Sequence, residues 1–332
     1  MKTIIIQKAF LSLFVFALFF VEVFAQQKPL FSQYMLNQYL INPAVAGTAE
    51  DYHLNAGFRQ QWVGVPDAPQ TFYVSGHGHV GKEHALLRRR HKNQNTWHHG
   101  LGFLLSGDRT GPISQYKFGL SYAYDFSITK TLRMSFGLTA GLYNRNLNVQ
   151  KLKFYEENST STEEIISRNN INEFRPDVDA GAWIYHPLFY AGIAANQLLM
   201  NPLGSPYNRT NGVNRLTQHY YATAGGLFHP SREIAIIPSF MFRMTQDAWS
   251  KPSLDLNCKV KYQNKVWGGV SYRNNDAIVG LVGILWDNRY EFGYAYDYTL
   301  NSLNINSSGS HEIMVGYRIV PKAHVMSPSD FW

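Results

Sequence analysis

Side chains of two kinds alternate along many short segments of this chain. Between residues 289 and 299, one set of alternate positions is aromatic, and the positions between are small or acidic. The two sets are Tyr290, Phe292, Tyr294, Tyr296 and Tyr298, and Glu291, Gly293, Ala295 and Asp297. Residues 116–126 and 254–262 repeat this period of two. Because successive side chains of a β-strand point to opposite faces, the pattern predicts strands with one apolar and one polar face.

The composition indicates what the apolar faces contact. Charged residues make up 16% of the chain and aromatic residues 15%, whereas about a quarter of an ordinary soluble domain is charged. No apolar run long enough to span a bilayer as a helix follows residue 25, which excludes a helical membrane protein. A soluble β-sandwich would also alternate, but it would seldom place five aromatic residues in a row on one face. We therefore predict a transmembrane antiparallel β-barrel, in which every second residue faces lipid.

About fourteen segments fit a tilted membrane strand, which needs 9–11 residues. They begin near Tyr52, Gln70, Trp97, Ile113, Thr131, Arg175, Leu188, Gln218, Arg232, Pro252, Lys265, Ala277, Arg289 and His311. An even number of strands puts both ends of the barrel chain on the same side of the membrane.

The connections between these segments suggest which side that is. Short connections follow every second strand from the fourth, at 128–130, 186–187, 229–231, 263–264 and 287–288. Longer ones lie at 147–174, 196–217, 246–251 and 300–310. Short turns face the periplasm in bacterial barrels, so both termini are expected there. The connection 81–96 breaks this rule, because it is long and should also be periplasmic.

The first 25 residues resemble a secretory signal peptide. Lys2 and Lys8 precede an apolar run over 9–21, and Val23-Phe24-Ala25 provides a relaxed cleavage site. A membrane anchor is the alternative, but the run is short of 18 residues and Glu22 interrupts it. The expected organisation is a signal peptide (1–25), an N-terminal periplasmic helix or plug (26–50), the barrel (51–320) and a C-terminal tail (321–332). Cys258 is the only cysteine, so no internal disulfide forms.

The segment 31–47, FSQYMLNQYLINPAVAG, is unusually apolar for the region near a mature N-terminus. Phe31, Met35 and Tyr39 are spaced as one face of a short helix, and Asn42 before Pro43 should end that helix. Two uses are open for it: packing in the barrel mouth, or docking a partner protein. Packing is favoured, because a free helix of this length is marginal in water. The polar residues that would then bond side chains of the barrel lumen are Gln33, Asn37 and Asn42.

Histidines and basic residues gather on both sides of residue 90. His77, His79, His98 and His99 are candidate ligands for zinc or copper, but a solvated rim of unrelated histidines is the favoured interpretation. The basic run 88–92 suits phospholipid head groups or an acidic partner, or forms a solvated loop. We find no nucleophile motif or metalloprotease spacing, so no enzyme activity and no cofactor are expected. The net charge of +7, or +6 without the first 25 residues, is too mild to indicate nucleic acid.

Several longer motifs resemble one family. Five segments are similar to signatures of the PorP/SprF family of type IX secretion system membrane proteins. They are the segment 31–47, RQQWVGVPDAPQTF at 59–72, GDRTGPISQYKFGLSYAYDF at 107–126, GGVSYRNNDAIVGLVG at 268–283 and FGYAYDYTLNSLNINSSGSHEIMVGY at 292–317. The resemblance runs from about residue 27 to 318, and the insert 81–96 departs from it. The motif residues that it marks as plug or partner contacts are Phe31, Gln33, Tyr34, Asn37, Tyr39, Asn42, Pro43, Gly47, Arg59, Gln60, Trp62 and Pro69.

The resemblance implies a non-catalytic outer-membrane component of type IX secretion in Bacteroidota-type cells. Such a protein would help deliver or retain a specific surface protein, such as a large adhesin used in gliding motility. Its expected partners are that cargo, other type IX components and outer-membrane lipid. Two alternatives stay open at this point: a structural anchor to a periplasmic peptidoglycan-binding protein, and a passive porin.

Overall fold

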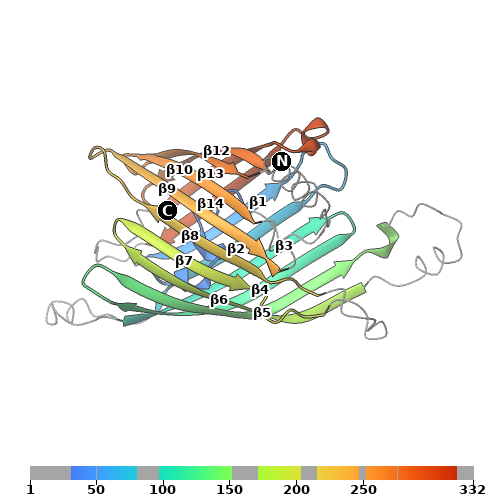
Figure 1. Ribbon diagram of the computed structural model, residues 1–332, viewed down its shortest axis with the longest axis horizontal. Coiled ribbons are helices and arrows are strands. Elements are labelled where there is room, and N and C mark those ends of the chain that lie inside the picture. The colour runs from blue at the N-terminus through green and yellow to red at the C-terminus, as the bar shows by residue number, and fades with distance from the viewer. Residues whose placement is uncertain are drawn as a thin grey trace, which may run out of the picture.

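Fourteen β-strands form one closed barrel in the computed structural model, which describes residues 31–49, 51–80, 97–151, 171–202, 215–246, 252–274 and 276–319. Each strand pairs antiparallel with the next, and the last pairs with the first, as Figure 1 shows from the side. This confirms the predicted fold and strand number. The proposed signal peptide, the insert 81–96 and the tail 321–332 lie outside the described residues.

The observed strands start close to the predicted positions. They are β1 (Tyr52–Gln60), β2 (Gln70–Val80), β3 (Trp97–Thr110), β4 (Ile113–Ser127), β5 (Arg133–Leu147), β6 (Ile171–His186), β7 (Phe189–Asn196), β8 (His219–Gly226), β9 (Ile234–Thr245), β10 (Ser253–Tyr262), β11 (Val266–Arg273), β12 (Ala277–Trp286), β13 (Tyr290–Thr299) and β14 (Ser310–Ile319). Only β6 departs by more than two residues. Its pairing with β5 continues as far as Leu147 and Ile171, so residues 171–174, predicted as loop, belong to the strand.

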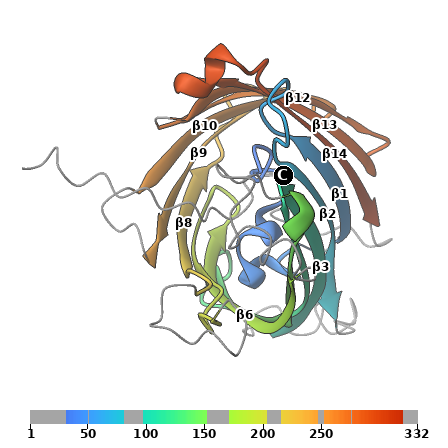
Figure 2. The ribbon, with the colours of Figure 1, turned by 90° about the vertical axis from the view of Figure 1, so that its right-hand side faces the viewer.

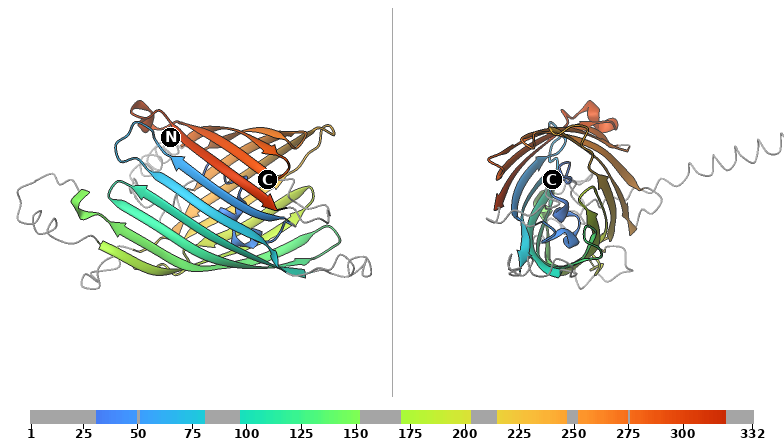
Figure 3. Two further views of the ribbon diagram at one scale, coloured as in Figure 1. Left: turned by 180° about the vertical axis from the view of Figure 1, so that it is seen from behind. Right: turned by 90° about the vertical axis from the view of Figure 1, so that its left-hand side faces the viewer.

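Strand length is less uniform than the 9–11 residues predicted. β3 to β6 contain 14 to 16 residues each, whereas β7, β8 and β11 contain 8. The wall formed by β3 to β6 consequently extends beyond the neighbouring strands in Figures 1 and 3. The prediction was wrong here because these hairpins continue past the length that a membrane requires.

The two faces of the strands are those that the alternation predicts. On β10, Asp255, Asn257 and Lys259 are buried in the interior, while Leu254 and Leu256 are exposed on the outside. On β13 the aromatic set faces outward, and the acidic and small residues face inward. The outer surface is therefore apolar and aromatic, and the inner surface is polar, as a barrel in a bilayer requires.

The barrel has two ends with different connections. We call the end at which β1, β3, β5, β7, β9, β11 and β13 finish the loop end, and the opposite end the turn end. Two of the turns place Gln263-Asn264 and Asp287-Asn288 in the left-handed backbone region, with φ of 50° to 52°. Asn and Asp tolerate this conformation, which gives the tight hairpin whose twist matches the strands.

Helical structure in the described residues is confined to short 3₁₀ turns: η1 (Gln38–Leu40), η2 (Pro43–Val45), η3 (Val149–Lys151) and η5 (Ser302–Ile305). None of the described helices has the length and apolar character needed to cross a membrane. The prediction of one continuous helix in the segment 31–47 was wrong. Its backbone hydrogen bonds mainly join residues three apart, such as Leu36 to Gln33 and Ala46 to Pro43.

Candidate functional site

Residues 31–49, which we call the luminal segment, lie inside the barrel. Figure 2 shows this segment, in blue, within the ring of strands. Every residue from Ser32 to Ala49 is buried. The segment begins near the loop end, where Ser32 contacts β14, and reaches the turn end at Gly47 before β1 starts at Tyr52. It therefore fills the barrel interior along the barrel axis.

A cluster of charged side chains holds the loop-end part of the luminal segment. The Ser32 amide donates to Glu312 Oε2 at 2.6 Å, and its hydroxyl donates to Asp297 Oδ2 at 2.7 Å. Arg59 donates to Ser32 Oγ at 2.5 Å and pairs with Asp297 at 2.7 Å and Glu312 at 3.2 Å. The three charged side chains are at most 2% exposed. We call Ser32, Arg59, Asp297 and Glu312 the anchor cluster.

A second arginine connects the anchor cluster to the neighbouring strands. Arg273 on β11 lies 3.6 Å from Asp297, 3.3 Å from Asp255 and 3.0 Å from Asp276. The network thus joins β1, β10, β11, β13 and β14 around one serine of the luminal segment. Burying an unpaired charge has a high free-energy cost. The cluster is therefore stable only while the ion pairs and the hydrogen bonds to Ser32 are intact.

The middle of the luminal segment is held by neutral hydrogen bonds. Asn37 donates to Ser75 Oγ on β2 at 2.8 Å, and Gln38 donates to the Tyr190 hydroxyl at 3.2 Å. The Tyr39 hydroxyl lies 2.6 Å from Ser121 Oγ on β4. Burial raises the pKa of Tyr39 to about 12, so its hydroxyl stays protonated at neutral pH.

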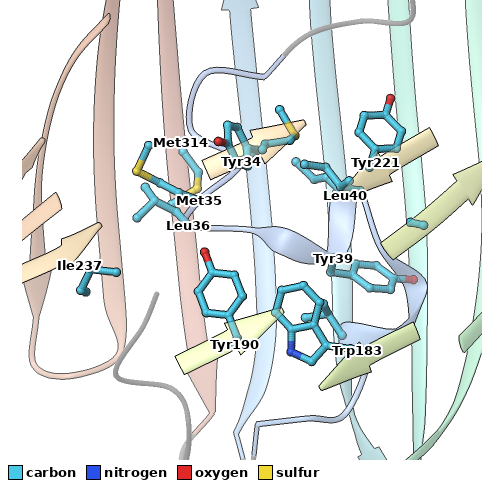
Figure 4. Packing of buried hydrophobic residues seen from close by; sticks show 14 of the residues in the cluster. Tyr34, Met35, Leu36, Tyr39, Leu40, Trp183, Tyr190, Tyr221, Ile237 and Met314 are labelled. Carbon is cyan, nitrogen blue, oxygen red and sulfur yellow. The ribbon is translucent and has the colours of Figure 1, made fainter. Parts of the chain in front are cut away.

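Apolar side chains of the luminal segment pack between these hydrogen bonds. In Figure 4, Tyr34, Met35, Leu36, Tyr39 and Leu40 lie among side chains from the barrel wall. The wall residues that the figure labels are Trp183, Tyr190, Tyr221, Ile237 and Met314. Tyr34 also accepts a hydrogen bond from Asn257 on β10. The apolar residues of the segment therefore face several walls at once, which is why one helical stripe does not describe them.

The turn-end part of the luminal segment lies against glycines. Asn42 donates to the backbone carbonyls of Ala182 on β6 and Ile193 on β7, at 3.1 and 3.0 Å, and accepts from the Ala44 amide at 2.9 Å. The inward positions beneath this part include Gly100, Gly137, Gly181 and Gly192, which we call the glycine seat. A Cβ at Gly137 would overlap the backbone of Pro43 and Ala44. Only glycine permits this close approach.

Gly137→Ala should consequently displace the luminal segment. We expect a loss of about 1–3 kcal/mol in the free energy of unfolding, as for other overpacked sites. Urea titration of the barrel in lipid vesicles measures it. Gly280→Ala is the matched control, because no atom lies within 4 Å of its added carbon; we expect a change within about 0.5 kcal/mol there. Equal losses of stability from the two substitutions would contradict the inference that the luminal segment packs closely against Gly137.

The candidate residues of the second motif occupy two places. Arg59 joins the anchor cluster, but Trp62 and Pro69 belong to the connection 61–69. Trp62 has φ of 45°, and its amide donates to Ser310 Oγ at 3.1 Å, while the Pro69 carbonyl accepts from Gln61. Gln60 ends β1 opposite Gln70 and His311. Of these four residues, only Arg59 has a hydrogen bond or ion pair to the luminal segment among the contacts between described residues.

The four candidate histidines do not form a common site. His77 packs against Tyr39, with ring centroids 4.9 Å apart. His98 lies 3.0 Å from the Gly47 carbonyl, whereas His99 points outward to the Tyr122 hydroxyl. His79 is near His98, at 6.1 Å between rings. Within the described ranges no group of three or more His, Cys, Asp or Glu side chains is placed to hold a metal ion.

Sequence reasoning missed several of the residues that hold the luminal segment. Glu312, Arg273 and Ser121 were not candidates, and neither was Gly137. A signal was present for the charged ones, because Glu312 and Arg273 occupy inward positions of strands whose outward neighbours are apolar. Their partners, however, are distant in the chain: Ser32 and Glu312 are separated by 280 residues.

These observations define the class of protein: a transmembrane β-barrel whose interior is filled by its own N-terminal segment. The family model for the type IX secretion system membrane protein PorP/SprF matches residues 23–317. The chain belongs to this family, and the protein is therefore an outer-membrane β-barrel component of type IX secretion.

Comparison with solved structures finds other barrels at low identity. CymD, a monoaromatic hydrocarbon channel, is 12% identical with a TM-score of 0.47, covering 87% of this chain and 92% of its own. The TodX deltaS2S3 mutant, also such a channel, is 9% identical with a TM-score of 0.45, covering 87% and 93%. Omp33 of Acinetobacter baumannii is 9% identical with a TM-score of 0.42, covering 82% and 100%. No curated protein matches the chain.

Proposed function

We propose that this protein helps type IX secretion to deliver or retain a specific surface protein, without catalysing a reaction. The observation that carries the proposal is the filled interior. A barrel of fourteen strands lies between small barrels filled by side chains and the larger porins with open channels. Here the luminal segment is buried along its length. A closed barrel favours a role in placing or holding a protein over passive diffusion of solutes.

The cargo would be a large adhesin, used for example in gliding motility, in a Bacteroidota-type cell. We propose that the turn end faces the periplasm, because short turns do so in bacterial barrels. The C-terminal end of β14 then faces the periplasm, where the protein would bind other type IX components or a peptidoglycan-binding protein. The loop end faces the outside, where a secreted protein would be received.

Deletion of the gene tests this proposal. Surface proteins of the deletion strain and its parent are labelled on intact cells and compared by mass spectrometry. We expect one or a few large secreted proteins to be lost from the surface while the others remain, and a plasmid copy of the gene to restore them. An unchanged surface would contradict the proposal. If the deletion instead reduced solute uptake, the passive porin would become the better interpretation.

A further inference from the structure

The luminal segment is held in two physically different ways. Its turn-end part lies with its backbone against the glycine seat and with Asn42 bonded to carbonyls of β6 and β7. Its loop-end part is held by the anchor cluster, through Ser32 and charged side chains of three strands. The first contact depends on steric fit along the wall, and the second depends on the relative positions of three strand ends.

The three charged residues of the anchor cluster lie next to two connections of the loop end. Arg59 is near the end of β1, before the connection 61–69. Asp297 and Glu312 lie on either side of the connection 300–309, near the end of β13 and the start of β14. Arg59 and Glu312 are also direct partners in the β1–β14 ladder, so their backbones are fixed by strand pairing. A displacement of these connections can therefore act on the cluster through its side chains.

The two connections are themselves joined. The Val63 amide donates to the Gly309 carbonyl at 2.8 Å, and the Ser308 amide donates to the Val63 carbonyl at 2.7 Å. Trp62 adds its bond to Ser310. The connections thus form one paired unit above the anchor cluster. The unit includes η5, whose Ile305 has 85% of its surface exposed. The unit is therefore accessible from outside the barrel.

We propose that the anchor cluster is a release latch. Movement of the paired connections separates Arg59 from Asp297 and Glu312 and frees residues 31–37 from the loop end, while residues 42–49 stay on the glycine seat. The barrel would then open from the loop end only, without losing its luminal segment. This inference rests on the proposed closure of the barrel by that segment, and it adds how the closure is regulated.

Reporter cysteines in the two parts of the luminal segment test the latch. With Cys258→Ser as background, Met35→Cys reports on the loop-end part and Val45→Cys on the turn-end part; both side chains are buried. Purified barrels in lipid vesicles are treated with a water-soluble thiol reagent. We expect Arg59→Gln to raise the labelling rate at residue 35 by about tenfold or more, because it leaves the buried Glu312 carboxylate without its arginine. At residue 45 the rate should stay within about twofold.

Arg215→Gln is the matched control, because Arg215 is an exposed arginine at the same end of the barrel but away from the connection 61–69, and it should change neither rate. Resistance of each variant to unfolding on an unheated gel shows that the barrel is intact, and Glu312→Gln gives a second variant if Arg59→Gln does not fold. Equal acceleration at both reporters would overturn the latch, because the segment would then leave as one piece. No acceleration in a folded barrel would also overturn it. These results come from purified protein, so they are separate from the surface comparison that tests the proposed function.

Discussion

A barrel in which residues 31–49 are replaced by a flexible glycine-serine linker of equal length should conduct ions, whereas the natural chain should not. The luminal segment lies in the interior, and residues 32–49 are all buried against the wall. Without it, the wall exposes polar side chains such as Ser75, Asn257 and Thr139. A polar interior of this strand number would fill with water. We expect the conductance to rise by about tenfold or more.

Recordings in planar lipid bilayers measure this change. The matched control is a barrel with a substitution on the lipid face, such as Leu120→Ala, whose side chain is 57% exposed and remote from the interior. The control should remain closed. If the natural chain already conducted as well as the linker variant, the luminal segment would not close the barrel. A passive channel would then be the better interpretation.

Removing the Arg59 side chain should cause a large loss of stability. Arg59→Ala leaves Glu312 buried without an arginine, leaves Asp297 with only Arg273 at 3.6 Å, and removes a hydrogen bond to Ser32. Breaking a buried ion pair in this way costs about 3–5 kcal/mol in the free energy of unfolding. Urea titration in lipid vesicles measures it, with exposed Arg109→Ala expected to stay within about 0.5 kcal/mol.

The double variant separates the ion pair from other effects of truncation. When Glu312→Ala is added, the carboxylate that lost its arginine is gone, so the combined loss should be smaller than the sum of the single losses. Residues in one such network typically differ from additivity by about 0.5–3 kcal/mol. Strict additivity would mean that Arg59 and Glu312 stabilise the barrel independently, and the anchor cluster would not be one unit.

The fold was largely predictable because one physical rule governs it. A strand between lipid and a polar interior must alternate, so the faces of β10 and β13 follow directly from their residues. Turn positions followed from the same alternation and from Asn and Asp at 264 and 287–288. The extra length of β3 to β6 was not predictable in this way, since it depends on hairpins that continue beyond the membrane.

The interior was less predictable, for reasons that particular residues show. The sequence predicted that Gln33, Asn37 and Asn42 bond side chains of the lumen. All three donate to the inner wall, but only Asn37 donates to a side chain, Ser75, whereas Gln33 and Asn42 donate to backbone carbonyls. It also suggested one helix, because Phe31, Met35 and Tyr39 are spaced as a stripe. The structure has turns instead, since these side chains meet different strands. Which strand each one meets depends on contacts between distant parts of the chain, as between Ser32 and Glu312, and a single sequence does not record them.

The proposed function depends on the luminal segment inside the barrel, and complementation of the deletion strain tests this dependence. The strain receives either the natural gene or the variant with the linker in place of residues 31–49, and its labelled surface proteins are compared by mass spectrometry. Both proteins must first be shown to reach the outer membrane in equal amounts. We expect the natural gene to restore the lost surface protein and the linker variant to leave it missing. Full restoration by the linker variant would contradict the account, because the filled interior would then have no part in the function.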